Sequence, residues 1–336
     1  MVELIKKRTD VVTEEISKFQ NNTQYRSNHK KDPGMFASTS TMDVSSVEFK
    51  SRAAERKNDI NAVAKKDVIT LPPTTTIMGV IKTMTGKGFR RVPIADAGTK
   101  RLEGIITSMD IVNFLGGGPK SLLVENYYKE NLLAAINADV SEIMQRDVAF
   151  VTSKASIADA VEMMIQRNTG GLPVVDEDNR VCAIFTERDF LDLMADTIDY
   201  DSIKDYMSTK VKTVPFDTTI EEAARIMVSK GFRRLPIVKD GILIGIVTAS
   251  NIMNFLGSGK AFEKMVTGNF HEAFSEPITS LITKDVIWAS PEMDMGDAAR
   301  LMIEKEVGSL PVIDNDVLCG IITERDFLRA VSSTYW

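Results

Sequence analysis

The stretch VKTVPFDTTIEEAARIMVSKGFRRLPIVKDGILIGIVTASNIMNFLG, residues 211–257, decides the fold because it contains the signals for five consecutive elements. A short β-branched strand is expected over Val211–Val214, ended by Pro215. Apolar side chains then recur at helical spacing between two threonines and Gly231, which predicts an amphipathic helix with a polar start and a glycine stop. The predicted apolar face of this helix comprises Ile220, Ala223, Ala224, Met227 and Val228.

The second half of the same stretch predicts a β-hairpin followed by a helix. Strands are expected over Leu235–Val238 and Ile242–Thr248, and the Asp240-Gly241 dipeptide between them favours a tight two-residue turn. A closing helix is expected from about Ala249 to Leu256. The order of elements in this unit is therefore βαββα.

The same pattern occurs four times in the chain. Each copy has a proline in the strand after the first helix and a threonine at the end of the last strand. The prolines are Pro93, Pro173, Pro236 and Pro311, and the threonines are Thr107, Thr186, Thr248 and Thr323. A unit of about 50–60 residues buries a core poorly by itself, so the units are expected to pair.

The repeats predict an α/β (α+β) protein of four tandem units. The expected divisions are a basic and polar, partly flexible extension (1–64), unit one (65–117), a linker (118–138), unit two (139–198), unit three (199–258), a linker (259–276) and unit four (277–336). Units one and three share GFRR and NFLG, whereas units two and four share LPV and TERDFL. The chain is thus a duplicated pair, and both linkers are expected to be partly helical.

Bulk composition excludes several classes of protein. The 336 residues are 43% hydrophobic and 26% charged, which is a globular composition, and no apolar run is long enough for a membrane span or a signal peptide. The two cysteines favour a reducing compartment, so a cytoplasmic location is expected. The net charge of −6 argues against general nucleic-acid binding. Residues 1–66 are basic, with 13 Lys or Arg against 9 Asp or Glu, and residues 47–66 could form a charged helix.

The closing sequences GIITSMD, AIFTERD, GIVTASN and GIITERD, each at the end of a βαββα unit, resemble those of the CBS domain. Four copies in one chain resemble the regulatory γ subunit of AMP-activated protein kinase. The resemblance extends from about residue 65 to residue 332. It implies that the units pair into two Bateman modules, each with two clefts on a pseudo-twofold axis, and that adenosine-containing ligands bind in these clefts.

A threonine and an aspartate three residues later begin the closing helix, a spacing that is typical of a helix capping box. The resemblance implies that the aspartate accepts hydrogen bonds from ribose hydroxyls and that the threonine contacts ribose or phosphate. The matching pairs are Thr107 with Asp110, Thr186 with Asp189 and Thr323 with Asp326. In unit three Thr248 is followed by Asn251, which lacks the charged acceptor, so that site departs from the pattern.

Two arginine pairs, Arg90-Arg91 and Arg233-Arg234, precede a strand in units one and three. Guanidinium groups match phosphate oxygens bidentately, and the resemblance implies phosphate contacts at these positions. Because neighbouring side chains on a strand point to opposite faces, one arginine of each pair is expected to face a cleft, unless the strand begins irregularly. Units two and four have small residues at the arginine positions, namely Gly170, Gly171, Gly308 and Ser309.

The expected clefts combine residues of paired units. One combines Arg90 and Arg91 with Thr186 and Asp189, and the other combines Arg233 and Arg234 with Thr323 and Asp326. The resemblance also implies that the base lies against the first strand of each unit. The residues concerned, which are equally typical of a core, are Val68, Ile69, Val148, Ala149, Val211, Lys212, Val286 and Ile287.

These observations favour a sensor protein that is not an enzyme. No Ser-His or Cys-His arrangement and no P-loop is present, and neither His29 nor His271 has the company of metal ligands, so no catalytic residue and no metal are expected. The expected regulatory ligand is AMP, ADP or ATP, with S-adenosylmethionine or a cyclic dinucleotide as alternatives. The other hypotheses are a ligand-free scaffold and a regulator that contacts nucleic acid through its N-terminal extension. An unidentified regulated protein is the expected partner, a homodimer is possible, and no membrane is expected.

Overall fold

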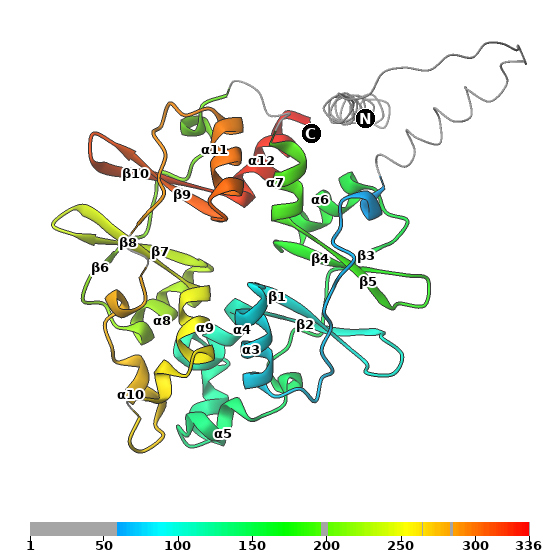
Figure 1. The fold of residues 1–336 in the computed structure, drawn as a ribbon, viewed down its shortest axis with the longest axis vertical. Coiled ribbons are helices and arrows are strands. Elements are labelled where there is room, and N and C mark those ends of the chain that lie inside the picture. Colours follow the sequence, from blue (N-terminus) through cyan, green and yellow to red (C-terminus); the bar gives the residue numbers. More distant parts are fainter. Residues whose placement is uncertain (1–58, 196–200, 264, 283–284, 336) are drawn as a thin grey trace, which may run out of the picture.

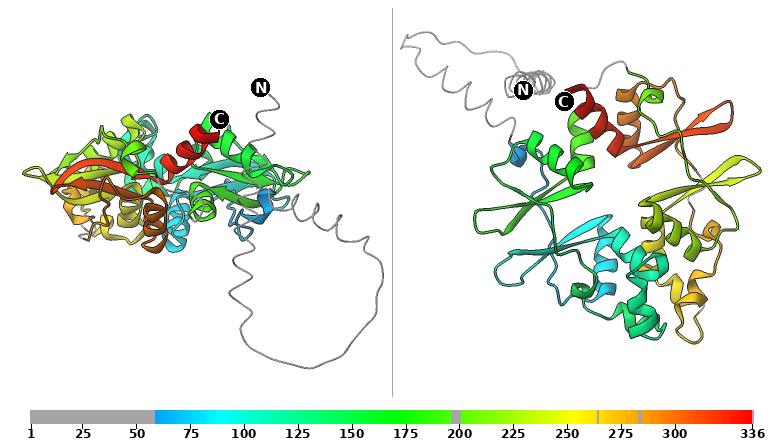
Figure 2. Two further views of the ribbon diagram at one scale, coloured as in Figure 1. Left: turned by 90° about the horizontal axis from the view of Figure 1, so that it is seen from above. Right: turned by 180° about the vertical axis from the view of Figure 1, so that it is seen from behind.

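The computed structural model describes residues 59–195, 201–263, 265–282 and 285–335. Four units of mixed helix and strand surround a common centre, and their hairpins point outward at the rim (Figure 1). Seen from the edge, the ring is much thinner than it is wide (Figure 2). The predicted α+β class is confirmed, while the expected N-terminal extension lies almost entirely outside the described residues.

Unit three has the predicted order of elements. It contains β6 (Val214–Pro215), α8 (Ile220–Lys230), β7 (Arg234–Lys239), β8 (Ile242–Thr248) and α9 (Ala249–Gly257). The Thr219 side chain caps the start of α8 by accepting a hydrogen bond from the Glu222 amide, and Gly231 ends the helix in the left-handed conformation. Asp240 and Gly241 both have positive φ, 53° and 81°, as expected of a tight two-residue hairpin turn.

Unit two repeats this order, and units one and four repeat it except that the first strand is reduced to an isolated bridge, at Leu71 and at Ala289. Unit one contains α3 (Ile77–Lys87), β1 (Arg91–Ala95), β2 (Leu102–Thr107) and α4 (Ser108–Val112), which continues into η2 (Asn113–Gly117). Unit two contains β3 (Val151–Thr152), α6 (Ile157–Gln166), β4 (Gly171–Val175), β5 (Val181–Thr186) and α7 (Glu187–Met194). Unit four contains α11 (Met295–Glu304), β9 (Ser309–Asp314), β10 (Val317–Thr323) and α12 (Glu324–Tyr335). In all four units the two main strands pair antiparallel as a hairpin.

The first strand of unit three is shorter than expected. In unit three it pairs only at Val214 and Pro215, parallel to β7, so the strand predicted over Val211–Val214 is largely wrong. The physical reason is that the preceding residues cross to the neighbouring unit, where Ser208 exchanges two backbone hydrogen bonds with Ile321 of β10. We call these crossing residues, 65–71 in unit one and 208–214 in unit three, the lead-in segments.

These crossings pair unit one with unit two and unit three with unit four. Lys65 of unit one bonds in the same way to Ile184 of β5, and Gln145 of unit two bonds to Ile105 of β2. We refer to units one and two as module one and to units three and four as module two. The expected pairing of the units is therefore present, and backbone hydrogen bonds from both directions hold module one together.

Helices join the two modules at the centre of the ring. Units one and three share one hydrophobic core, in which α3 packs on α9 and η2 packs on α8. Units two and four meet through α7, α11 and α12. The NFLG sequences common to units one and three serve this packing, because a side chain at Gly257 would overlap Thr85 of α3. Gly118 lies just as close to Val228, the equivalent position on α8.

Both linkers are partly helical, as expected. The first contains η3 (Leu123–Tyr127) and α5 (Leu132–Ile136), followed by η4 (Val140–Glu142) at the start of unit two. The second contains η6 (Lys260–Phe262) and α10 (Phe270–Phe274), followed by η7 (Ile278–Ser280). The remaining short helices are η1 (Ile60–Ala62) and η5 (Ile203–Asp205), which begin units one and three.

The folded part of the chain begins earlier than expected, because Ile60 of η1 is fully buried in the core of unit two. Residues 59–64 are thus packed rather than part of a flexible extension. Most of the charged helix considered over residues 47–66 lies outside the described residues. Within the part that the structure describes, no helix has the length and apolar character needed to cross a membrane.

Candidate functional site

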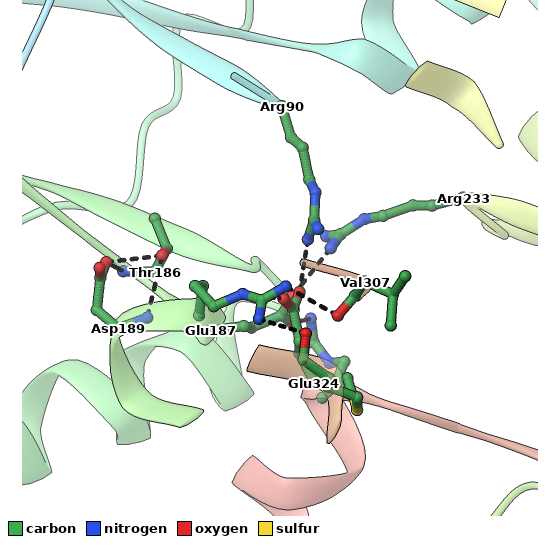
Figure 3. A network of polar contacts seen from close by, with 10 residues as sticks. Arg90, Thr186, Glu187, Asp189, Arg233, Val307 and Glu324 are labelled. Carbon is green, nitrogen blue, oxygen red and sulfur yellow. Dashed lines mark hydrogen bonds and ion pairs between the residues drawn. The ribbon is translucent and has the colours of Figure 1, made fainter. Parts of the chain in front are cut away.

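A capping box forms at the start of the closing helix in the two TERD sequences. Asp189 Oδ2 accepts hydrogen bonds from the Thr186 amide at 2.8 Å and from its hydroxyl at 2.6 Å (Figure 3). Asp326 accepts the same two bonds from Thr323, both at 2.8 Å. In each aspartate this leaves Oδ1 for other partners. Lys65 Nζ lies 3.3 Å from Oδ1 of Asp189, and Arg329 Nη1 lies 3.8 Å from Oδ1 of Asp326.

A cavity of about 670 Å³, cavity one, lies where unit one meets the TERD turn of unit two. Arg90 and Arg91 line it together with Thr186, Val68 and Ile69, so the structure brings these predicted residues together. Asp189 is buried directly behind Thr186, since the capping box joins the two side chains. Residues of unit four, including Glu324, close the inner end of the cavity.

The equivalent cavity in module two, cavity two, has a volume of about 380 Å³. Its walls contain all six residues predicted there. These are Arg233, Arg234, Thr323, Asp326, Val211 and Lys212. Glu187 and Glu324 line both cavities, so the two sites approach each other at the centre of the ring.

Both arginines of each pair line their cavity, which corrects the expectation that one would face it. Strand β1 begins at Arg91 and strand β7 begins at Arg234, so Arg90 and Arg233 precede the regular strands and are not bound by their alternation. Arg90 extends to the centre of the ring, as does Arg233 (Figure 3).

The small residues of units two and four let the arginines approach the backbone. A side chain at Gly171 would stand 2.1 Å from Arg91 Nη1, and one at Gly308 would stand 2.8 Å from Arg90 Nη2. Gly170 likewise lies against Arg91 and Arg233. Gly170, Gly171 and Gly308 thus leave the space that the guanidinium groups of units one and three occupy.

Two buried glutamates meet these arginines at the centre. Arg90 Nη1 lies 2.5 Å from Glu324 Oε2, and Arg188 Nε lies 2.9 Å from Glu324 Oε1. In the mirror arrangement, Arg233 and Arg325 lie 3.0 and 3.1 Å from the two oxygens of Glu187. We call these ion-paired residues the central cluster; its members are Arg90, Arg188, Arg233, Arg325, Glu187 and Glu324.

The charges at the centre perturb one another. Burial alone would raise the pKa of Glu187, but the charges of Arg233, Arg91 and Arg325 outweigh it and hold that pKa below its usual value. Desolvation, followed by the charge of Arg233, lowers the pKa of Arg91 to about 10. Desolvation also lowers the pKa of Arg234 to about 10. Both guanidinium groups stay charged at neutral pH.

The predicted residues of the other clefts are arranged differently. Asp110 keeps its capping box with Thr107, but its carboxylate also accepts Lys120 Nζ at 2.6 Å and Gln145 Nε2 at 3.0 Å. Every oxygen lone pair of Asp110 is therefore used. Thr248 and Asn251 form a capping box as well. Neither cavity one nor cavity two is lined by any of these residues or by Val148, Ala149, Val286 and Ile287.

Glu187, Glu324, Arg188 and Arg325 were not among the residues predicted from the sequence. They are the second and third residues of the TERD sequences, which occur in units two and four, whereas units one and three have SMD and ASN after the threonine. This difference between the units was the one signal in the sequence that could have pointed to these four residues. Within the described ranges, no group of three or more His, Cys, Asp or Glu side chains is arranged to hold a metal ion.

Comparisons with known proteins agree with this architecture. A family model of the CBS domain matches four segments, residues 59–117, 140–196, 203–258 and 278–333. The uncharacterized protein MJ1225 of Methanocaldococcus jannaschii is 40% identical over 266 residues, which are 79% of this chain and 95% of that protein. An uncharacterized 33.4 kDa protein in the ribosomal RNA operon of Thermofilum pendens is 28% identical over 258 residues, 77% of this chain and 86% of that one.

Solved structures show the same likeness. The crystal structure of MJ1225, described as a candidate archaeal homologue of γ-AMPK, matches with a TM-score of 0.78 at 38% identity and covers 81% of this chain and 99% of that one. An uncharacterized conserved protein from Pyrococcus horikoshii, 20% identical and with a TM-score of 0.53, has a similar fold over 81% of this chain and 99% of its own. The four copies predicted from the sequence are thus confirmed.

Proposed function

This chain belongs to the CBS-domain family, and we propose that it is a regulatory protein that binds adenine nucleotides in cavities one and two and thereby modulates a partner protein. The observation that carries the proposal is the repeated composition of the two cavities. Each contains an arginine pair from one unit, the threonine of a TERD capping box from the paired unit, and apolar or aliphatic side chains of a lead-in segment.

The phosphates and the ribose of a nucleotide each have side chains of suitable chemistry in the cavity walls. The guanidinium pairs Arg90-Arg91 and Arg233-Arg234 suit one to three phosphates, because each fork donates two parallel hydrogen bonds. Asp326 Oδ1, whose contact with Arg329 Nη1 is 3.8 Å long, suits the ribose hydroxyls, since Oδ2 is already engaged by Thr323. The cavity volumes, about 670 and 380 Å³, suit a small ligand.

The base would lie against the lead-in segments. Val68 and Ile69 line cavity one, and Val211 with the aliphatic part of Lys212 lines cavity two. These segments cross from one unit to the next, so a ligand resting on them would contact both units of a module. The description of MJ1225 as a candidate homologue of γ-AMPK supports a regulatory role.

Isothermal titration with AMP, ADP and ATP tests the proposal. The wild-type chain should bind at micromolar concentrations with two sites per chain, and Arg234→Ala should remove the site in cavity two. Arg167→Ala, which removes an exposed arginine that pairs with Asp147 on the surface, is the matched control and should retain both sites. The absence of heat with all three nucleotides would refute the proposal and favour a scaffold without ligands.

A further inference from the structure

The two glutamates of the central cluster are the most deeply buried acidic groups that line the cavities. The side chains of Glu187 and Glu324 are 4% and 3% exposed. Each is the first residue of its helix, so the capping turn before it fixes its position at the inner end of the cavity walls. A buried carboxylate is stable only with close partners, and arginines supply them here.

The ion pairs of both glutamates all cross from one module to the other. Glu324 of module two is paired with Arg90 and Arg188 of module one, and Glu187 of module one is paired with Arg233 and Arg325 of module two. Arg90 and Arg233 are also the residues expected to meet ligand phosphates in cavities one and two. The same guanidinium groups thus have a carboxylate partner inside the protein and a phosphate partner in the ligand.

The positive charge at the centre exceeds what the two glutamates neutralise. Six arginines stand against two glutamates when Arg91 and Arg234 are counted with the central cluster. Arg91 Nη1 is shielded from solvent and has no hydrogen-bond partner among the described residues. A buried donor of this kind is costly unless it is satisfied, so the centre has capacity for further anionic oxygens.

We propose that Glu187 and Glu324 are affinity- and specificity-determining residues: they are internal anions that compete with ligand phosphates for Arg233 and Arg90 and disfavour longer phosphate chains. The inference rests on the proposed function for the identity of the ligand, but the competition itself concerns any phosphate chain that enters the cavities. A phosphate group that bonds to Arg90 draws it from Glu324. A longer chain extends toward Glu324 itself and meets its negative charge.

Charge-neutral variants test this competition. Glu324→Gln and Glu187→Gln keep the shape of the side chain and remove the competing charge in cavities one and two respectively. Titrations with adenosine, AMP, ATP and pyrophosphate separate the nucleoside from the phosphate contribution. Glu304→Gln is the matched control, because Glu304 is an exposed acid on α11 beside cavity one but outside its wall.

The expected result is a gain in affinity that grows with the number of phosphates. Each glutamate variant should leave adenosine binding unchanged and tighten ATP and pyrophosphate binding at its cavity by about tenfold, with a smaller gain for AMP. The control should change each affinity by less than about twofold, as expected for an exposed charge. Affinities for ATP and pyrophosphate that stay the same or weaken in a folded variant would overturn the inference.

A second variant covers the case in which the neutral side chain prevents folding. Glu324→Asp retains the charge but withdraws it by one methylene group from Arg90, so it should give an intermediate gain; an unchanged affinity for pyrophosphate in this folded variant would equally overturn the inference. The two proposals fail separately. Pyrophosphate binding that tightens in a chain without nucleotide binding would refute only the proposed function, whereas nucleotide binding that is insensitive to both glutamates would refute only the competition.

Discussion

Replacement of Gly171 by alanine tests the packing of Arg91 in cavity one. An added methyl group at Gly171 would stand 2.1 Å from Arg91 Nη1 and 2.9 Å from the backbone oxygen of Phe185. Ordinary contacts begin at 3.4 Å, so the guanidinium group would have to move by about 1.3 Å. The strand pairing of Gly171 with Thr186 limits any movement of the glycine itself.

Two consequences follow, one for stability and one for binding. Overpacking of this kind typically costs about 1–3 kcal/mol, and a loss of about 2 kcal/mol would lower the thermal midpoint of a chain of this size by about 3 °C. The displaced Arg91 would also lose its position toward a ligand phosphate. A hydrogen bond to a charged group contributes about 1.5–3 kcal/mol, so AMP should bind cavity one at least about tenfold more weakly.

Thermal denaturation and calorimetric titration with AMP measure the two effects. Gly86→Ala on α3 is the control, because nothing lies within 4 Å of the added methyl group. Alanine within a helix is more favourable than glycine by about 0.5–1 kcal/mol, so this control should unfold at the same or a higher temperature. Wild-type stability together with wild-type AMP affinity in Gly171→Ala would show that Arg91 does not rest on this glycine.

The remaining predictions concern the acidic caps. Asp189→Ala and Asp326→Ala should each remove one AMP site in calorimetry, whereas Asn251→Ala should leave both; loss of binding in the last variant would contradict the ranking of the clefts. Lys120→Ala should leave Asp110 Oδ1 with Gln145 as its partner and add a weaker third site, and an unchanged stoichiometry would exclude Lys120 as the group that closes that cleft. Asp326→Asn should raise the thermal midpoint at pH 7, because desolvation raises the pKa of Asp326 and its charged form then costs stability as pH rises through that pKa. The gain should vanish below about pH 4, where the carboxyl is protonated in both states, and a gain independent of pH would contradict this cause.

The features predicted correctly from the sequence depend on neighbouring residues. Thr219 and Gly231 delimit α8 because a side-chain cap and a left-handed glycine act within one helical turn. The Asp240-Gly241 turn follows from the positive φ that both residues adopt. Because the same sequence pattern occurs four times, the elements predicted for unit three could be predicted for the other units too. The family model confirms all four units.

The features that were missed depend on contacts between distant parts of the chain. The lead-in strand of unit three is short because Ser208 pairs with Ile321, which is more than 100 residues away in the sequence. Both Arg90 and Arg91 line one cavity because the regular strand begins only at Arg91. Glu324 was missed because its arginine partners belong to the other module, and no local pattern indicates a partner at that separation.

The alternation of GFRR and TERD sequences along the chain is explained by ion pairs between the two modules. If each arginine pair served only its own cavity, each buried glutamate of the TERD turns would keep a single ion-pair partner, Arg188 for Glu324 and Arg325 for Glu187, which is a costly arrangement. Instead, Arg90 reaches Glu324 and Arg233 reaches Glu187, so each cavity shares a charge with the opposite module. A phosphate that takes Arg90 leaves Glu324 with Arg188 alone, and Glu324 also forms part of the wall of cavity two. If phosphates bind as proposed, occupation of one cavity would alter the charge that faces the other, and this link would let the two modules respond to ligand together.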